Sequence, residues 1–212
     1  MTKVRQAFTW IYFIMYLSLL WITSVLVGLV LFSFIPACVT AIQQIHLMKK
    51  DNLRGQLALG SRYYALFFDK LKDYYLISLA ATCLLVVLIT NYLFLSRTSG
   101  FVTYLLFYLT IAMILAWFWI MTTYSVVAND YSHISIKEQV KNSMFIVLSH
   151  LLEFLIVAVI HVALTLVLWT VSPLLVVFAP IIGLILFDYL VGRLLNGFSI
   201  RSYFSNFINS HE

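Results

Sequence analysis

Five ionisable side chains lie within or beside the last apolar stretches of this sequence, where hydrocarbon would surround them in a membrane. They are His150, Glu153, His161, Asp188 and Arg193. At about 100° per helical residue, Glu153 lies about 60° and His161 about 20° from His150, so the three form one polar stripe. Asp188 follows in the next stretch at a depth similar to that of Glu153. Ionisable groups inside a bilayer usually mark function, so these five form a candidate intramembrane polar cluster.

Three roles fit this cluster. It could be a structural contact between helices, or a set of head groups that reach the membrane surface. It could instead dock another membrane subunit, or carry protons or ions. A continuous pathway draws polar groups from several helices across the full depth, which argues against transport. The middle of the 75–95 stretch offers only Thr82, Cys83 and Thr90.

Enzyme motifs are absent from the sequence. It contains no HExxH, no GxSxG and no glycine-rich phosphate loop, and neither cysteine has a partner at CxxC spacing. We therefore predict no enzyme activity, no catalytic or metal-binding residues, no cofactor and no direct nucleotide binding. The net charge of +5 comes from basic residues beside apolar stretches, as membrane topology requires, and does not indicate nucleic-acid binding.

The composition shows what must position these side chains. The 212 residues are 63% hydrophobic and 10% charged, with a mean hydropathy of +1.01, whereas soluble domains carry about 25% charged residues. Within lipid, the backbone must satisfy its own hydrogen bonds, and only helices or a closed barrel do so. Stretches that are apolar on all faces favour helices. We expect one all-α polytopic membrane domain over residues 1–212. Its six transmembrane helices are predicted at 8–32, 36–50, 75–95, 101–127, 144–171 and 174–195, the second being short or re-entrant.

The charge distribution selects a topology. Residues 8–48 contain no Asp, Glu, Lys or Arg, and they are long enough to cross twice with a turn at Pro36. Two crossings place every Lys and Arg except Arg97 on one side of the membrane, whereas a single crossing moves Lys3 and Arg5 to join Arg97. The first distribution obeys the positive-inside rule better. It predicts that both termini are cytoplasmic.

Residues 51–73 form the one substantial polar segment, and apolar side chains recur in it at helical spacing. This periodicity predicts an amphipathic cytoplasmic helix. It either lies on lipid head groups or docks on a cytoplasmic or membrane partner. The candidate docking residues are Leu57, Tyr64, Phe67, Phe68, Leu71 and Tyr75.

Two segments carry a resemblance to a known family. Residues 32–41 read FSFIPACVTA, and residues 67–74 read FFDKLKDY. Together with the layout of the whole chain, they resemble the YesL family of bacterial integral membrane proteins, a domain of unknown function. That family commonly carries GPATAA after its first helix, and here the glycine is missing. It also has Phe and Asn where this chain has Leu71 and Asp73. The motifs cover only residues 20–75.

The resemblance implies a context, because such proteins tend to be encoded beside carbohydrate ABC importers. The predicted function is a non-catalytic accessory subunit of such an importer in a bacterial plasma membrane, with the lipid bilayer and ABC permease subunits as partners. The alternative is a small homo-oligomeric transporter or channel that uses His150, Glu153 and His161. A membrane-bound enzyme is the weakest reading.

Overall fold

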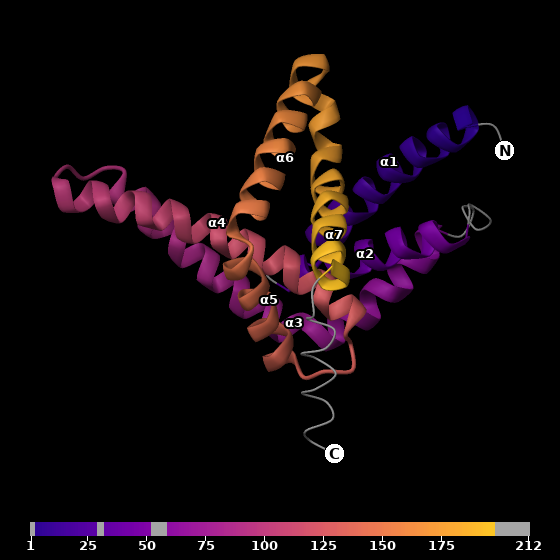
Figure 1. Cartoon of the computed structure of the whole chain (residues 1–212), viewed down its shortest axis with the longest axis horizontal. Coiled ribbons are helices and arrows are strands. Elements are labelled where there is room, and N and C mark those ends of the chain that lie inside the picture. Colours follow the sequence, from indigo (N-terminus) through magenta and orange to yellow (C-terminus); the bar gives the residue numbers. More distant parts are fainter. Residues whose placement is uncertain (1–2, 29–31, 52–58, 198–212) are drawn as a thin grey trace.

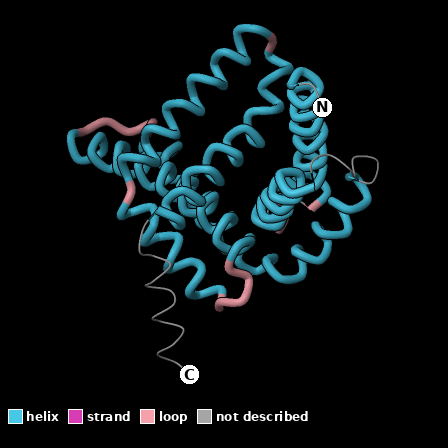
Figure 2. The backbone as a smooth tube through the Cα atoms, turned by 45° about the vertical axis from the view of Figure 1, so that its right-hand side comes forward, coloured by secondary structure: helices cyan, strands magenta, loops and turns pink. Residues whose placement is uncertain are grey.

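Every regular element that the structure describes is a helix. The computed structural model describes residues 3–28, 32–51 and 59–197 (Figures 1 and 2). Its helices are α1 (Lys3–Val27), α2 (Phe34–Asp51), α3 (Leu59–Leu95), α4 (Phe101–Asp130), α5 (Ile136–Ser149), α6 (Leu151–Val171), the 3-10 helix η2 (Pro173–Phe178) and α7 (Ala179–Gly197). The prediction of an all-α protein is confirmed.

Five segments of the described chain are long and apolar enough to cross a membrane. They lie in α1, α3, α4 and α6 and in η2 together with α7. Their apolar side chains face outward, since only 6% of the most apolar part of α6 and 11% of that of α4 is buried. Apolar surfaces of this size are unfavourable in water, so the chain is a multi-pass membrane protein whose helices contact lipid. The predicted sixth crossing coincides with α2, which is not among the five.

The helix α2, which is the least apolar of the six predicted crossings, lies at the centre of the fold. It contacts α1, α3, α4 and α7, and its small residues Ala37, Cys38 and Ala41 are all buried. Small side chains let neighbouring helices approach closely. The helix begins at Phe34, two residues before the predicted start, and places Pro36 in its first turn. A proline is tolerated there because the first N–H groups of a helix have no helical partner.

The turn that precedes α2 depends on a glycine. Helix α1 ends at Val27, five residues before its predicted end at residue 32. A Cβ atom on Gly28 would lie 2.2 Å from the Cβ atom of Ser33, so no other residue fits this close approach. Ser33 also donates a hydrogen bond to the Val25 carbonyl oxygen at 3.0 Å. The chain can therefore fold back on the end of α1.

The predicted boundary near residue 74 is wrong, because α3 runs without interruption from Leu59 to Leu95. Its buried residues continue along one face through the whole length: Leu59, Tyr63, Phe67, Tyr74, Ser78, Ala81, Thr82, Leu88 and Leu95. The amphipathic segment and the next predicted crossing are thus two parts of one helix. Leu57 lies outside the described residues.

Two further boundaries differ at the C-terminal end. The predicted helix 144–171 is split at His150, whose φ of −126° and ψ of 35° interrupt the helical hydrogen bonds between α5 and α6. The predicted helix 174–195 begins instead as the 3-10 helix η2, and α7 follows from Ala179. Pro180 therefore lies in the first turn of α7 and does not kink a longer helix. Earlier in the chain, α4 extends three residues beyond its predicted end at residue 127, to Asp130.

The helices form a core with two projecting hairpins. The C-terminal half of α4 is buried from Thr122 to Ala128, whereas its first half is mostly exposed. This first half pairs with the end of α3, where the Asn91 amide donates to the Thr110 hydroxyl at 2.9 Å. Figure 1 shows this α3–α4 hairpin pointing away from the core in one direction and the α6–α7 hairpin in another. The core lies where α1, α2, the first part of α3, the end of α4 and α7 meet.

Candidate functional site

A buried carboxylate lies where α2, α4 and α7 come together. Asp188 of α7 is only 4% exposed, yet it is one of the few charged groups in the apolar core. Its position follows from helical spacing, because Leu184 and Val191 on the same face pack into the core beside it. A buried charge requires charged or hydrogen-bonding partners. Asp188 finds both on α2.

Two side chains of α2 bind the two oxygens of Asp188 separately. The His46 Nε2 atom lies 2.7 Å from Oδ1, and the Lys49 Nζ atom donates to Oδ2 at 2.8 Å. His46 and Lys49 are three residues apart, so one helix face presents both. The Lys49 side chain is 47% exposed and that of His46 30% exposed. Both side chains therefore retain contact with the surroundings, and Lys49 supplies a positive charge to the buried carboxylate.

The second ring nitrogen of His46 faces the end of α4. Its Nδ1 atom lies 3.5 Å from Asp130 Oδ1 and 3.3 Å from the amide nitrogen of Asn129. The Asn129 amide also donates to Asp130 Oδ1 at 2.9 Å, which fixes the amide nitrogen on this side. We call these five residues the His46 network: His46, Lys49, Asn129, Asp130 and Asp188.

The two carboxylates act on His46 in the same direction. The hydrogen bond to Asp188 and the negative charges of Asp188 and Asp130 raise the pKa of His46 above its ordinary value, against the opposing effects of burial and of Lys49. His46 lies outside the five apolar spans. With His46 protonated, the network holds two positive and two negative charges and is neutral. The His46 ring is the group in this network that can take up or release a proton.

The intramembrane polar cluster that the sequence suggested is divided among separate places. His150 Nδ1 and Glu153 Oε1 lie 3.5 Å apart at the start of α6, as their spacing predicts. The ring of His161 instead contacts the Ala179 carbonyl oxygen at 3.0 Å. Asp188 joins the His46 network and Arg193 is exposed.

Most of the candidate docking residues take part in internal packing. Phe67 is buried in the core, Leu71 packs against it, and the Tyr64 hydroxyl lies 2.6 Å from that of Thr23 on α1. Of the candidate docking residues that the structure describes, Phe68 and Tyr75 present the large exposed surfaces, with 51% and 43% of each residue exposed. These two aromatic residues are therefore accessible to a partner.

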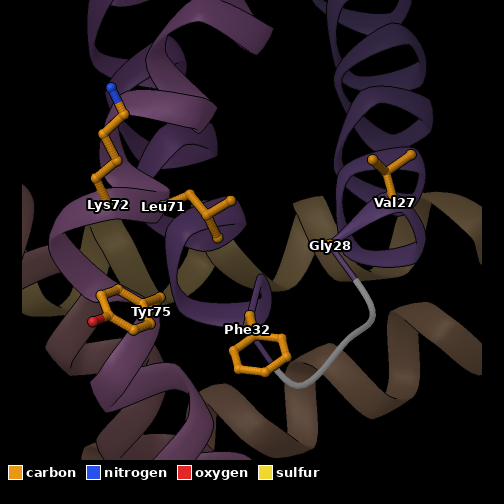
Figure 3. Close-up of a pocket in the computed structure, with 6 residues that line it drawn as sticks. All are labelled: Val27, Gly28, Phe32, Leu71, Lys72 and Tyr75. Carbon is orange, nitrogen blue, oxygen red and sulfur yellow. The ribbon is translucent and has the colours of Figure 1, made fainter.

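A shallow hollow of about 490 Å³ lies between the end of α1 and α3. Its walls are Val27, Gly28, Phe32, Leu71, Lys72 and Tyr75, drawn in Figure 3. The lining is mostly apolar, and Lys72 supplies its single amine. Such a lining carries no catalytic arrangement. No group of three or more potential metal-ligating side chains gathers in the described ranges.

Sequence reasoning identified Asp188 but missed its partners. His46 and Lys49 both lie in the predicted second helix at 36–50, and no partner was predicted for either. The three-residue spacing of His46 and Lys49 was the one available signal. Comparison with known proteins adds no relative: no family model matches the chain, and no curated protein or solved structure is significantly similar to it. The resemblance to the YesL family therefore stays a prediction from the layout of the chain and from motifs in residues 20–75.

Proposed function

We propose that this chain is a non-catalytic accessory subunit of a bacterial carbohydrate ABC importer and packs against the permease helices in the plasma membrane. The resemblance to the YesL family supplies the identity of the partner. The surface of the molecule supplies the reason to expect a protein partner, and the placement of its polar groups argues against independent transport.

The observation that carries the proposal is the uncovered surface of the α3–α4 hairpin and of α6. Phe101, Tyr104 and Tyr108 on α4 are each more than half exposed, as are Leu152 and Val159 on α6. These faces belong to helices that are held to the core along only part of their length (Figure 1). Transmembrane helices of this kind can pack on lipid or on the helices of another subunit. A permease offers such helices.

The dispersal of the polar side chains favours this role over transport. A pathway through His150, Glu153 and His161 needs these groups to line one route. Instead, the first two pair at the start of α6 and the third is hydrogen-bonded to the α7 backbone. The His46 network, in turn, joins the C-terminal ends of α2 and α4 to the middle of α7 and does not continue along these helices. The homo-oligomeric transporter is therefore the less favoured function.

The proposed topology has six crossings and both termini cytoplasmic. Helix α2 is the buried second crossing, and its last turns, which carry His46 and Lys49, are at the cytoplasmic surface. In support, the C-terminal parts of α2 and α4 meet at the His46 network, which the middle of α7 completes with Asp188. The segments that follow these three helices would all be cytoplasmic in this topology. A short helix shielded by its neighbours needs no lipid-facing apolar surface of its own.

Affinity purification from detergent-solubilised membranes tests the proposal. We expect the tagged chain to recover ABC permease subunits, and we expect Phe68→Glu to weaken this recovery if the exposed part of α3 contributes to docking. Phe8→Glu, at an exposed aromatic residue of α1 outside the surfaces named above, is the matched control. Recovery of no permease subunit, in a detergent that keeps importer complexes intact, would defeat the proposal.

A further inference from the structure

We propose that His46 is a proton-operated switch between α2 and α4, whose Nδ1 atom donates to Asp130 when the ring is protonated and accepts from Asn129 when it is neutral. The inference concerns the internal behaviour of this protein and does not depend on the identity of its partner.

The Nε2 atom provides the fixed side of the switch. It lies 2.7 Å from Asp188 Oδ1, and a carboxylate can only accept a hydrogen bond at this distance. The proton on Nε2 is therefore present in both states of the ring. The neutral form must be the tautomer with Nε2 protonated, and titration takes place at Nδ1.

The Nδ1 atom faces a donor and an acceptor that are adjacent in sequence. In the imidazolium ion, Nδ1–H can donate a hydrogen bond to Asp130 Oδ1, which lies 3.5 Å away. In the neutral ring, Nδ1 can instead accept a hydrogen bond from the Asn129 amide nitrogen at 3.3 Å. Both groups belong to the last two residues of α4. The end of this one helix therefore satisfies either protonation state, but with a different side chain each time.

Charge gives the two states different strengths of contact. The charged groups that act on His46 within the described chain are Asp188 from α7, Asp130 from α4 and Lys49 from α2 itself. Protonation adds an ion pair between α2 and α4, and deprotonation leaves Asp130 beside an uncharged ring. The side chains of His46 and Asp130 are 30% and 31% exposed, so protons can be exchanged with the surroundings. The junction of α2 and α4 is therefore tighter at lower pH.

The test is a pH titration of the wild-type protein in lipid nanodiscs, followed by nitrogen NMR of ¹⁵N-labelled histidine rings. Loss of one signal in His46→Gln assigns the resonance. We expect the neutral ring of His46 to carry its proton on Nε2, and we expect titration at a pKa above the ordinary value. The tautomer and the titration are measured on the wild-type protein, and the variant serves only for the assignment. A neutral His46 ring protonated on Nδ1 overturns the proposal.

Two substitutions at the end of α4 should move the titration in opposite directions. Asp130→Asn removes the anion that stabilises the imidazolium ion, so we expect the pKa to fall. Asn129→Ala removes the donor to the neutral ring, so we expect it to rise; each shift should be on the order of half a unit or more. The signal of exposed His133 is the internal control. Shifts of the same sign in both variants, or no shift in either, would overturn the partner exchange.

Discussion

The carboxylate of Asp188 is held by cations that are themselves partly exposed. An isolated charge in an apolar interior costs far more free energy than folding can supply, so the carboxylate needs Lys49 and His46 to remain ionised there. The buried residue depends on its partners more than they depend on it. Lys49 can be hydrated once the pair is broken, whereas Asp188 cannot.

This asymmetry gives a prediction for single substitutions. We expect Lys49→Gln to lower the free energy of unfolding by about 3 kcal/mol, because it leaves the buried carboxylate without one of its counter-charges. We expect Asp188→Asn to cost less, about 1–2 kcal/mol, since the amide keeps one acceptor and the partly exposed partners can be hydrated. Reversible unfolding in mixed micelles measures both. A larger effect for Asp188→Asn would contradict this account of the network.

The stability should also depend on pH through His46. Because folding raises the pKa of His46, its ion pairs contribute fully below the ordinary pKa of histidine, and their contribution is lost as pH rises through the folded-state pKa. We therefore expect the melting temperature of the wild-type protein to fall across this interval. The slope should be smaller in His46→Gln and unchanged in His133→Gln. Equal slopes in all three proteins would contradict the assignment.

Residues of this site could be recognised from sequence only in part. An acidic side chain in an apolar stretch marks Asp188 as unusual, because lipid cannot solvate it. The partners could not be named, since His46 is 142 residues away and nothing in the spacing joins α2 to α7. The contact between His150 and Glu153 lies within the reach of sequence, because it is local, between residues three apart on the chain.

At the scale of elements, α6 and α7 approach closely at Gly183. A Cβ atom there would lie 2.7 Å from His161 Cε1 and 2.9 Å from Nε2. We expect Gly183→Ala to displace the His161 ring from the Ala179 carbonyl and to cost about 1–3 kcal/mol, as overpacked sites do. Thermal unfolding of the purified protein measures the loss.

Gly192, on the same helix, is the matched control for this substitution. A Cβ atom there meets no atom within 4 Å, so Gly192→Ala gains only the better helix propensity of alanine, up to about 1 kcal/mol. We expect the two variants to differ in sign. A destabilised Gly192→Ala, or a neutral Gly183→Ala, would contradict the packing described for this hairpin.

The start of α5 gives a further prediction at this scale. The Ser135 hydroxyl accepts from the Glu138 backbone N–H at 3.4 Å, and Glu138 accepts from the Ser135 N–H at 3.2 Å, a reciprocal capping box. We expect Ser135→Ala to cost about 1 kcal/mol and to speed hydrogen exchange in the first turn of α5. Ser132→Ala, in the preceding turn, should leave both unchanged. Equal effects would show that the cap does not stabilise α5.

Helices were predicted well where the length of an apolar stretch sets their ends. They were predicted poorly where a charged residue was taken as the end of a helix. The crossings at 101–127 and 75–95 correspond to α4 and to the second part of α3. The charged side chains before residue 74 mark the part of α3 that lipid cannot cover, but they do not end the helix, because its buried face continues. The break at His150 gave no signal, since the sequence around it is suited to a continuous helix.

At the scale of the whole molecule, the proposed topology can be tested by labelling. We expect a membrane-impermeant maleimide to label Ser99→Cys, in the α3–α4 turn, on intact cells. Ser132→Cys, in the turn after α4, should react only after the membrane is opened. The wild-type protein, with Cys38 and Cys83, measures the background. Labelling of Ser132→Cys from outside would reverse the orientation.

The overall arrangement lay largely beyond the reach of the sequence. Composition predicts a helical membrane protein, because hydrocarbon permits few other structures. It does not predict which helix is central, and hydropathy alone would place the most apolar helix there. The structure places α2 at the centre because small side chains allow close contact from several directions, and it leaves the more apolar α6 at the periphery.

The ion pair between α2 and α7 also has a consequence for biogenesis. The ribosome releases His46 and Lys49 long before Asp188, so during synthesis α2 must wait without its counter-charge until the final helix enters the bilayer. A chain cut short before α7 would leave Lys49 without the carboxylate that it binds, and His46 would keep Asp130 alone. The cell therefore has a simple chemical mark by which its quality-control proteases could tell an unfinished copy from a finished one.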